Sequence, residues 1–504
     1  MSQHASQAQA SPEAERVQRP LCVDLDGTLV KSDTLYDSLC VLLRHKPASA
    51  LKLPFWLVGG KARVKAELAR VAPLDAARLP YNQKLLNFLR QEKRNGRAIY
   101  LVTGADERLA AAVAEHLNLF AETLGSDGQK NLTGNRKLEV LKARFGSFDY
   151  IGNASVDLPL LAASVEPMVA NPSRGLLLAL KARGMRPVHD FRDHRPFLKT
   201  ITKAIRVHQW AKNVLIFVPL LLAHTLTRAS MLAAVACFFC FSFTASANYL
   251  VNDLLDIESD RHHASKRLRP FAAGDLSVLR GLFLILLLLA AAVVLLVLPA
   301  LPWSFVLWLI AYAVVTTSYS FWLKRIALVD VIVLSGLYTL RMLAGAAATG
   351  TPISPWLASF STFLFLSLAM VKRFSEIENL RERGVATTHG RGYLVSDLEQ
   401  IRSFGTASGF VAVLVFTFYI SRPDVEVLYR HAMRLWLIVP LLLLWLMRVW
   451  LKASRGELDD DPVIFAIRDK MSLAIGAAVA AIALFAMWDI SLQGSIEFFR
   501  RILG

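Results

Sequence analysis

Cysteine is scarce in this sequence. Its 504 residues contain four cysteines, Cys22, Cys40, Cys237 and Cys240. This number is too small for a disulfide-stapled scaffold. Cys237 and Cys240 form a CxxC pair, but no second pair of Cys or His residues accompanies them, which excludes the usual zinc-binding pattern. Because the pair lies within the apolar run 231–243, we interpret both residues as buried apolar side chains.

Charged residues are also scarce, and basic residues outnumber acidic ones. Asp, Glu, Lys and Arg make up 19% of the chain and hydrophobic residues 54%, with 57 Lys and Arg against 40 Asp and Glu. This hydrophobicity excludes intrinsic disorder as the state of the chain. It also exceeds what one soluble core can bury. The long apolar runs lie almost entirely after about residue 200, which predicts a soluble N-terminal part and a membrane C-terminal part.

The beginning of the sequence lacks an apolar segment. Residues 1–19 are polar and have no apolar centre of the kind found in a secretory signal peptide. We therefore expect a disordered leader here, followed by a domain that stays in the cytosol.

The soluble part alternates short apolar strands with helical patterns. The strand-like runs Leu21–Val23, Ala98–Val102 and Tyr150–Ile151 each end at polar or glycine residues. Strands separated by helices predict a parallel, doubly wound α/β sheet of the Rossmann type. In such a sheet, ligands bind beyond the carboxyl ends of the strands.

Nine apolar segments follow, each close to the length of about 20 residues that spans a bilayer. They lie near residues 206–225, 230–252, 279–299, 303–321, 328–349, 354–371, 404–420, 432–451 and 471–491. The loops alternate between charged and uncharged, and the positive-inside rule places the charged loops and the N-terminal domain on the cytosolic face. The sequence thus predicts an all-α, multi-pass C-terminal domain with nine transmembrane helices, in a protein of the inner membrane. Nine spans would leave the C-terminus on the external face of the membrane. The basic residues Arg500 and Arg501, beyond the ninth segment, conflict with this placement.

The first group of candidate catalytic residues follows the first strand. Asp24 is placed to attack a phosphorus atom, and Asp26 to protonate the leaving group. Thr103, at the end of the next strand, is suited to hold the phosphate, and Lys137 to neutralise it. Asp157 is a candidate ligand of Mg²⁺, which prefers carboxylate and phosphate oxygens.

The segment 24–30, DLDGTLV, resembles the signature of haloacid dehalogenase-like (HAD) hydrolases, and the resemblance covers about residues 20–195. It implies that Asp24 is both nucleophile and metal ligand, and that residues 33–95 form a helical cap. Lys130 is an alternative to Lys137. One departure is Asn153, which stands where the family has a metal-binding carboxylate. A HAD fold retained as a regulatory or docking module therefore stays open beside an active phosphatase.

A second acidic group lies where the second apolar segment ends. Asn252, Asp253, Asp256 and Asp260 form the pattern NDxxDxxxD. On one continuous helix the three aspartates share a face. Clustered carboxylates at a membrane surface predict Mg²⁺ that bridges them to a diphosphate. Basic residues suited to phosphate oxygens follow at Arg261, Lys266, Arg267 and Arg269.

These residues resemble the UbiA family of intramembrane prenyltransferases, which have nine transmembrane helices and a catalytic aspartate-rich motif. The resemblance covers about residues 200–495, and the family's second motif corresponds to residues 319–330, ending at Asp330. Many members carry another carboxylate where this chain has Leu334. Further along the same helix, about 16 Å deeper at 1.5 Å per residue, lies Arg341. A charged residue at that depth is a candidate functional residue that holds an anionic lipid group or pairs with Asp330 or with neighbours of Asp256.

Several stretches resemble one UbiA branch in particular, the decaprenyl-phosphate phosphoribosyltransferases. They are residues 208–213, residues 249–270, Asp330 with residues 340–345, and residues 372–376. The resemblance implies transfer of phosphoribose from phosphoribosyl diphosphate to a polyprenyl phosphate. The fusion with a HAD domain leads to the further hypothesis that this domain removes the 5-phosphate of the product. The residues expected to bind the phosphates are Lys212, Lys266, Arg267, Lys372 and Arg373.

Two other interpretations remain open. The first is transfer of a polyprenyl group from a polyprenyl diphosphate to an aromatic or other acceptor, with a regulatory or inactive HAD domain. The second is a transporter or regulatory membrane protein, which the lack of charge in most apolar segments disfavours. Nucleic acid is not an expected partner, because the basic residues lie mainly beside membrane segments, where anionic lipids account for them.

Overall fold

The computed structural model describes residues 18–224, 226–297, 301–382, 392–458 and 462–487. Within these ranges the chain forms two compact units, which are described separately below. The first unit comprises residues 18–206 and 249–286, and the second comprises residues 207–248 and 287–487. Most of the expected leader and the C-terminal residues Arg500 and Arg501 lie outside the described residues.

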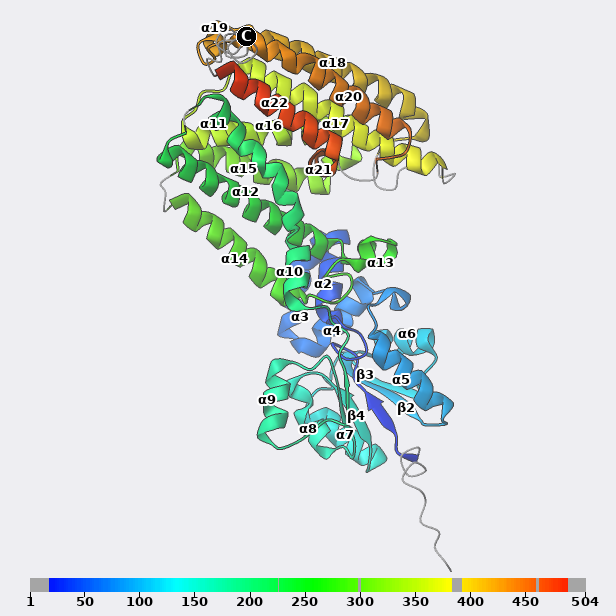
Figure 1. Ribbon diagram of the computed structural model, residues 1–504. Helices are drawn as coiled ribbons and strands as arrows, with labels where there is room; N and C mark the ends of the chain where they lie inside the picture. Colours follow the sequence, from blue (N-terminus) through cyan, green and yellow to red (C-terminus); the bar gives the residue numbers. More distant parts are fainter. Residues whose placement is uncertain (1–17, 225, 298–300, 383–391, 459–461, 488–504) are drawn as a thin grey trace, which may run out of the picture. The chain divides into compact units, whose positions relative to one another are not determined.

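The first unit contains a six-stranded parallel sheet with strand order β3-β2-β1-β4-β5-β6, which confirms the predicted parallel sheet (Figure 1). Its strands are β1 (Leu21–Val23), β2 (Ile99–Asp106), β3 (Glu122–Ser126), β4 (Asp149–Gly152), β5 (Pro167–Ala170) and β6 (His189–Phe191). The helices between and after them are α2 (Thr34–His45), α3 (Leu53–Val58), α4 (Gly60–Val71), α5 (Gln83–Arg94), α6 (Glu107–Leu117), α7 (Asn135–Phe145), α8 (Leu158–Ala163), α9 (Arg174–Ala182) and α10 (Phe197–Ala204).

Alternate residues of the central strand pack on opposite faces of the sheet. Leu21 and Val23 belong to the apolar core beneath α5 and α6, whereas Cys22 belongs to the core beneath α7, α8 and α9. Successive side chains of a strand point to opposite faces, so a strand buried on both sides is apolar throughout. The sheet is therefore covered by helices on both faces.

A separate apolar cluster holds α2, α3 and α4 together. It includes Val41, Trp56, Val64 and Leu68, all of which are buried. Helix α5 lies outside this cluster, because its leucines pack into the core of the sheet. Within residues 33–95, where the cap was expected, α2, α3 and α4 thus share one apolar cluster and α5 packs on the sheet.

The second unit is all-helical apart from short connections. Eight helical segments of the described chain are long and apolar enough to cross a membrane. They are α12 (Arg228–Leu255), α14 (Val278–Val297), α15 (Trp303–Phe321), α16 (Val329–Thr349), α17 (Pro355–Glu382), the segment Val395–Ile420 with α18 (Leu398–Ile420), the segment Ala432–Ser454 with α20 (Ile438–Ser454), and α22 (Lys470–Met487). Of the remaining α-helices, α11 (Val218–Leu222), α19 (Pro423–Glu426) and α21 (Pro462–Arg468) belong to the second unit, whereas α13 (Ile257–His262) belongs to the first.

The ninth expected span is not confirmed. Residues 206–225 were expected to cross the bilayer, but they form a 3₁₀ helix over Val207–Phe217 followed by the short α11. Pro219 lies at the start of α11, where a backbone N–H would have no acceptor within the helix, so proline is tolerated there. The apolar length of a segment therefore overestimates its α-helical length.

Helix α16 approaches residues 207–217 closely at one glycine. A Cβ atom added to Gly345 would lie 2.1 Å from the carbonyl oxygen of Ile216. Because the obstructing atom belongs to the backbone, it cannot move aside as a flexible side chain does. Gly336, on the same helix, has no atom within 4 Å of its hypothetical Cβ.

We expect Gly345→Ala to destabilise the membrane part by about 1–3 kcal/mol, the usual cost of overpacking. Thermal unfolding of the detergent-purified protein measures the effect. Gly336→Ala is the matched control, since alanine fits there and favours helix. Equal unfolding temperatures for the two variants would contradict the close approach.

Candidate functional site

Asp24 begins the loop at the carboxyl end of β1. Its carboxylate accepts a hydrogen bond from Lys137 Nζ, 2.7 Å away, and another from the Thr28 hydroxyl at 3.4 Å. Lys137 also donates to the Tyr150 hydroxyl at 3.0 Å. The structure thus brings together the expected nucleophile and the expected charge stabiliser, although α7 carries Lys137 113 residues away along the chain.

Asp24 is buried and Asp26 is partly buried, and the pKa values of both carboxyl groups are shifted. Burial raises the pKa of Asp24 to about 6, against the lowering effect of Lys137, and the negative charge of Asp157 raises it further. Burial also raises the pKa of Asp26 to about 6, together with the charge of Asp33, whereas a hydrogen bond from the Thr34 N–H lowers it. A general acid that changes protonation near neutral pH is suited to proton transfer.

These residues line a cavity of about 730 Å³ at the carboxyl edge of the sheet. Asn153, Asn171 and Arg192 also line it, and they follow β4, β5 and β6 in the same way that Asp24 follows β1. Because the strands are parallel, their carboxyl ends meet at one edge. Thr103 is buried in β2 and does not line the cavity; its hydroxyl accepts a hydrogen bond from Ala105 N.

Asp157 lines the cavity but has several protein partners. One carboxylate oxygen accepts the backbone N–H groups of Asn153 and Ala154, at 3.1 and 3.0 Å, and the other accepts the Tyr150 hydroxyl at 3.0 Å. No group of three or more acidic, His or Cys side chains in the described ranges could hold a metal. Mg²⁺ needs only one or two carboxylates and retains several waters, so Asp24, Asp157 and the Asn153 amide oxygen fit it.

The aspartate-rich segment is not one continuous helix. Helix α12 ends at Leu255 and α13 begins at Ile257, with Asp256 between them at φ −95° and ψ 11°. The expectation that three aspartates share one helical face is therefore wrong. Asp253 and Asp260 do lie together, since both carboxylates bind one guanidinium, that of Arg269, at 3.0 and 2.8 Å.

Every aspartate of this segment is paired with arginine. Asp253 also binds Arg206 at 2.6 Å, and Asp256 binds Arg44 of α2 at 3.1 Å. Asp253 and Asp260 are nearly inaccessible to solvent. Burial raises the pKa of Asp260 to about 6, although Arg269 lowers it. Carboxylate pairs of this kind fit Mg²⁺, but here the arginines supply the positive charge.

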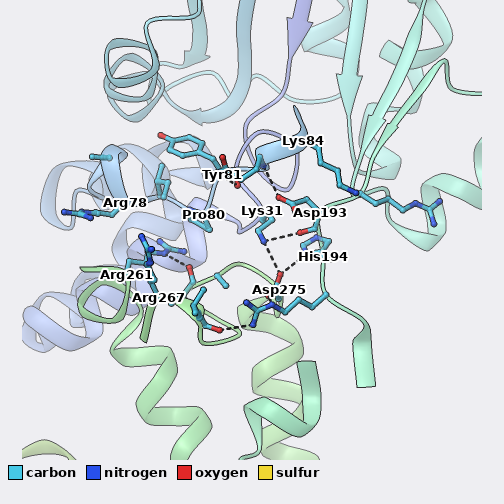
Figure 2. Close-up of a pocket in the computed structure, with 18 residues that line it drawn as sticks. Lys31, Arg78, Pro80, Tyr81, Lys84, Asp193, His194, Arg261, Arg267 and Asp275 are labelled. Carbon is cyan, nitrogen blue, oxygen red and sulfur yellow. Dashed lines mark hydrogen bonds and ion pairs between the residues drawn. The ribbon is translucent and has the colours of Figure 1, made fainter. Parts of the chain in front are cut away.

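The neighbouring basic residues of this segment differ in their surroundings. Lys266 and Arg267 are exposed, and Asn252 is half-buried. Arg267 lines a second cavity, of about 500 Å³, shown in Figure 2. The side chains of Lys31, Asp275 and His194 meet at this cavity.

In the second unit, Asp330 begins α16 and is completely buried. Its carboxylate binds Arg373 Nε at 2.6 Å and accepts a hydrogen bond from the Tyr393 hydroxyl. Arg373 also binds Glu376 at 2.5 Å and the Tyr319 hydroxyl at 3.2 Å. The sequence pattern did not indicate a role for Tyr393, whereas Tyr319 lies in the motif that ends at Asp330. Lys372, next to Arg373, is half-buried.

Arg341 lies about three turns beyond Asp330 on α16. Asp330 is not its partner, contrary to one of the expectations. Its guanidinium binds the Asn213 amide oxygen at 2.8 Å and the Tyr312 hydroxyl at 3.2 Å, and it lies 5.4 Å from the Tyr338 ring centroid. In the described part of the chain no carboxylate pairs with Arg341, so its positive charge is solvated by neutral groups.

Lys212 and an apolar cavity lie near the same aromatic residues. Lys212 Nζ is 5.6 Å from the centroid of the Tyr338 ring, which stacks on Phe365. Phe365 and Met342 line an apolar cavity of about 270 Å³. The second unit therefore places cationic groups and an apolar cavity next to one stacked aromatic pair, Tyr338 and Phe365.

The sequence of this chain matches the UbiA prenyltransferase family over residues 214–474, just over half of its length. The chain belongs to the UbiA prenyltransferase family. Residues 21–162, which include the loop with Asp24 and Asp26, match the family of haloacid dehalogenase-like hydrolases. This UbiA protein is therefore an enzyme with an N-terminal HAD domain, and the eight apolar helices of its described residues make it an integral membrane protein.

Three relatives are similar to this UbiA protein. An uncharacterized protein of Sinorhizobium fredii, y4nM, is 38% identical over 93% of this chain and 91% of its own. The nodulation protein NoeC of Azorhizobium caulinodans is 33% identical over 58% of this chain and 94% of its own. A decaprenyl-phosphate phosphoribosyltransferase of Mycobacterium tuberculosis is 34% identical over 37% of this chain and 63% of its own.

The ion pairs of Asp275 give the first unit a defined response to acid. Although burial raises it, the hydrogen bond from His194 and the charges of Lys31 and Arg195 hold the pKa of Asp275 below its ordinary value. A lowered pKa stabilises the fold above the unfolded-state value, about 4, and this contribution is lost as the pH falls through the folded-state value.

We expect Asp275→Asn to lower the thermal unfolding temperature of the full-length protein at pH 7, by an amount that shrinks below about pH 4. Calorimetry between pH 3 and 7 measures it. Asp190→Asn, which removes a more exposed ion pair with Arg192, is the control and has little effect. A difference from wild type that is constant with pH would contradict this assignment.

Proposed function

We propose that this UbiA protein transfers 5-phosphoribose from phosphoribosyl diphosphate to a polyprenyl phosphate, and that its HAD domain then removes the 5-phosphate. The observation that carries the proposal is the pairing of Asp253 and Asp260 with Arg206 and Arg269. The named activity of the decaprenyl-phosphate phosphoribosyltransferases, 34% identical to this chain, supports the choice of substrates.

The acidic segment contains both parts of a site for a metal–diphosphate complex. The two carboxylates are suited to Mg²⁺, and the two guanidinium groups are suited to phosphate oxygens. When the diphosphate binds, Arg206 and Arg269 exchange their carboxylate partners for phosphate oxygens. The released carboxylates would hold Mg²⁺, which would supply positive charge to the diphosphate. Each charged group thereby keeps an opposite charge beside it.

The transfer forms one bond to the sugar and breaks another. An oxygen of the lipid phosphate bonds to C1 of the ribose, while the bond between C1 and the diphosphate oxygen breaks. The diphosphate leaves with the electron pair of that bond. Arg206 and Arg269 stabilise the negative charge that develops on it.

The second unit is suited to the lipid acceptor. The apolar cavity of about 270 Å³ accepts part of a polyprenyl chain, and Arg341 and Lys212 are cations near the aromatic pair that borders it. Asp330 and Arg373 bind each other. We therefore assign them to orientation of α16 and α17.

The HAD domain completes the reaction sequence. Asp24 attacks the phosphorus of the 5-phosphate, and the sugar hydroxyl leaves with a proton from Asp26. Water then hydrolyses the aspartyl phosphate, and Asp26 accepts the proton from the water. Lys137 balances the charge on Asp24 and on the phosphate. Asp24, Asp157 and Asn153 would hold Mg²⁺ there. The relative y4nM matches 93% of this chain and so includes both parts.

We further propose that the protein lies in the inner membrane with its HAD domain in the cytosol, where phosphoribosyl diphosphate is made. Membrane lipids are then its surroundings and nucleic acid is not a partner. Transfer of a prenyl group to an aromatic acceptor is the competing activity within the family. The two activities differ in which substrate loses diphosphate.

The purified protein, incubated with labelled phosphoribosyl diphosphate, Mg²⁺ and polyprenyl phosphate, is expected to transfer label into the lipid fraction. Asp253→Asn should lower this transfer by at least about 10²-fold, because the charge that holds the metal is lost. The exposed Asp190→Asn is the control. The proposal would be contradicted if the acceptor product gained label from a polyprenyl diphosphate and none from phosphoribosyl diphosphate.

Asp24→Asn separates the two steps. The lipid product of this variant should retain its 5-phosphate, with phosphate release reduced by about 10³-fold or more, while transfer of phosphoribose continues. Mass spectrometry of the lipid reports both steps. Asp127→Asn, at an exposed position of the HAD domain outside the cavity, leaves both unchanged. Release of phosphate by Asp24→Asn at the wild-type rate would exclude this residue as the nucleophile.

A further inference from the structure

Part of the wall of the phosphatase cavity comes from outside the HAD sequence. Besides Asp24 and Asp26, the cavity is lined by Gly274, Asp275, Ser277 and Arg280. These residues lie in the connection between α13 and α14 and in the first turn of α14. They are more than 240 residues away from Asp24 along the chain, but they belong to the same compact unit.

This wall is fixed to the catalytic loop by a close backbone approach. Gly274 has φ +70°, and a Cβ atom on it would lie 2.8 Å from the Cβ of Lys31. Lys31 directly follows the segment 24–30 that contains Asp24. Its Nζ binds the Asp275 carboxylate at 3.1 Å, where both side chains are nearly buried, and Figure 2 shows the two side chains meeting.

A second buried contact holds the same connection in place. Arg261, in α13, binds the Asp37 carboxylate at 2.7 Å and the Ser32 hydroxyl at 3.1 Å. Arg261 and Asp37 are each buried, so separating them would leave an unpaired buried charge. The ion pairs of Asp275 and Arg261 thus hold this part of the wall against the HAD domain.

The same wall leads directly into a candidate membrane span. Arg280 N donates to the Ser277 hydroxyl at 3.4 Å in the first turn of α14. The most apolar part of α14 has a mean hydropathy of 2.8, and side chains that follow Arg280, such as Phe283 and Leu286, are exposed. A molecule in the cavity therefore lies beside the first turn of α14, a candidate membrane span.

Several hydrogen-bond donors at the cavity have no protein acceptor. The Nδ2 atom of Asn171 is buried and makes no hydrogen bond, although its Oδ1 accepts one from Asp193 N. Arg280 and Arg174 are exposed and form no ion pair within the described ranges. Lys137, in contrast, is already paired with Asp24. These free donors favour a ligand with an anionic group in addition to the phosphate that Asp24 attacks.

We propose that the phosphatase cavity selects a phosphomonoester that is anchored in the membrane, and that Arg280 of α14 binds a second, phosphodiester group of this substrate. The proposal deepens the proposed function, on which it rests for the identity of the sugar. A polyprenyl-phosphoribose 5-phosphate has both groups. The substrate is selected by the part of the cavity wall that contains Arg280, and not by recognition of the sugar.

Steady-state hydrolysis by the full-length protein in detergent micelles tests this selection. Three substrates are compared: ribose 5-phosphate, farnesyl-phosphoryl-ribose 5-phosphate and phosphatidylglycerol phosphate. We expect Arg280→Gln to raise KM for the two lipid substrates by about 10-fold or more, the scale of one charge-assisted hydrogen bond. The KM for ribose 5-phosphate should stay within about twofold. Arg183→Gln, an exposed arginine outside the cavity, is the matched control.

The outcomes distinguish this inference from the proposed function. Hydrolysis of phosphatidylglycerol phosphate that depends on Arg280, without hydrolysis of the phosphoribosyl lipid, supports the inference and refutes the sugar assignment. Equal KM changes for all three substrates, or none, overturn the inference. Binding of the same three molecules to Asp24→Asn gives the answer without turnover, because equal affinities for lipid and soluble molecules would also overturn it.

Discussion

The compensation of buried negative charge is the constraint on which both sites depend. A carboxylate removed from water is stable only beside a cation or several hydrogen-bond donors. Asp24 meets this requirement with Lys137, Asp253 and Asp260 meet it with Arg269, and Asp330 meets it with Arg373. The pairs of Asp24 with Lys137 and of Asp330 with Arg373 also bring together residues that are distant along the chain.

The same constraint gives the acidic segment its chemistry. Arginines that neutralise carboxylates in the free protein are well suited to bind the oxygens of an arriving diphosphate, because a planar guanidinium recognises both anions. Asp330 and Arg373 differ, since tyrosine hydroxyls and Glu376 complete their network. We therefore assign exchange of partners to Asp253 and Asp260, and a fixed orientation to Asp330.

Much of the fold follows from local patterns, whereas the partners of charged residues do not. Strands that end at Asp24 and Gly152 predict a parallel sheet with a site at its carboxyl edge, because the strand ends themselves carry the polar residues. The break at Asp256 has no such signal, since NDxxDxxxD is compatible with a continuous helix. Short apolar segments such as 206–225 are equally ambiguous. The wall formed by Gly274 and its neighbours depends on packing between distant segments, which the sequence does not reveal.

The exchange of arginine for a metal–diphosphate complex is tested most directly with Mn²⁺ as a paramagnetic substitute for Mg²⁺. Asp24→Asn removes one of the residues that would hold metal in the HAD domain. Electron paramagnetic resonance on this variant therefore reports Mn²⁺ bound at the acidic segment. We predict tight Mn²⁺ binding only when phosphoribosyl diphosphate is present, and its loss when Asp253→Asn is added. Mn²⁺ binding that is equally tight without the diphosphate, or that survives Asp253→Asn, would contradict the account.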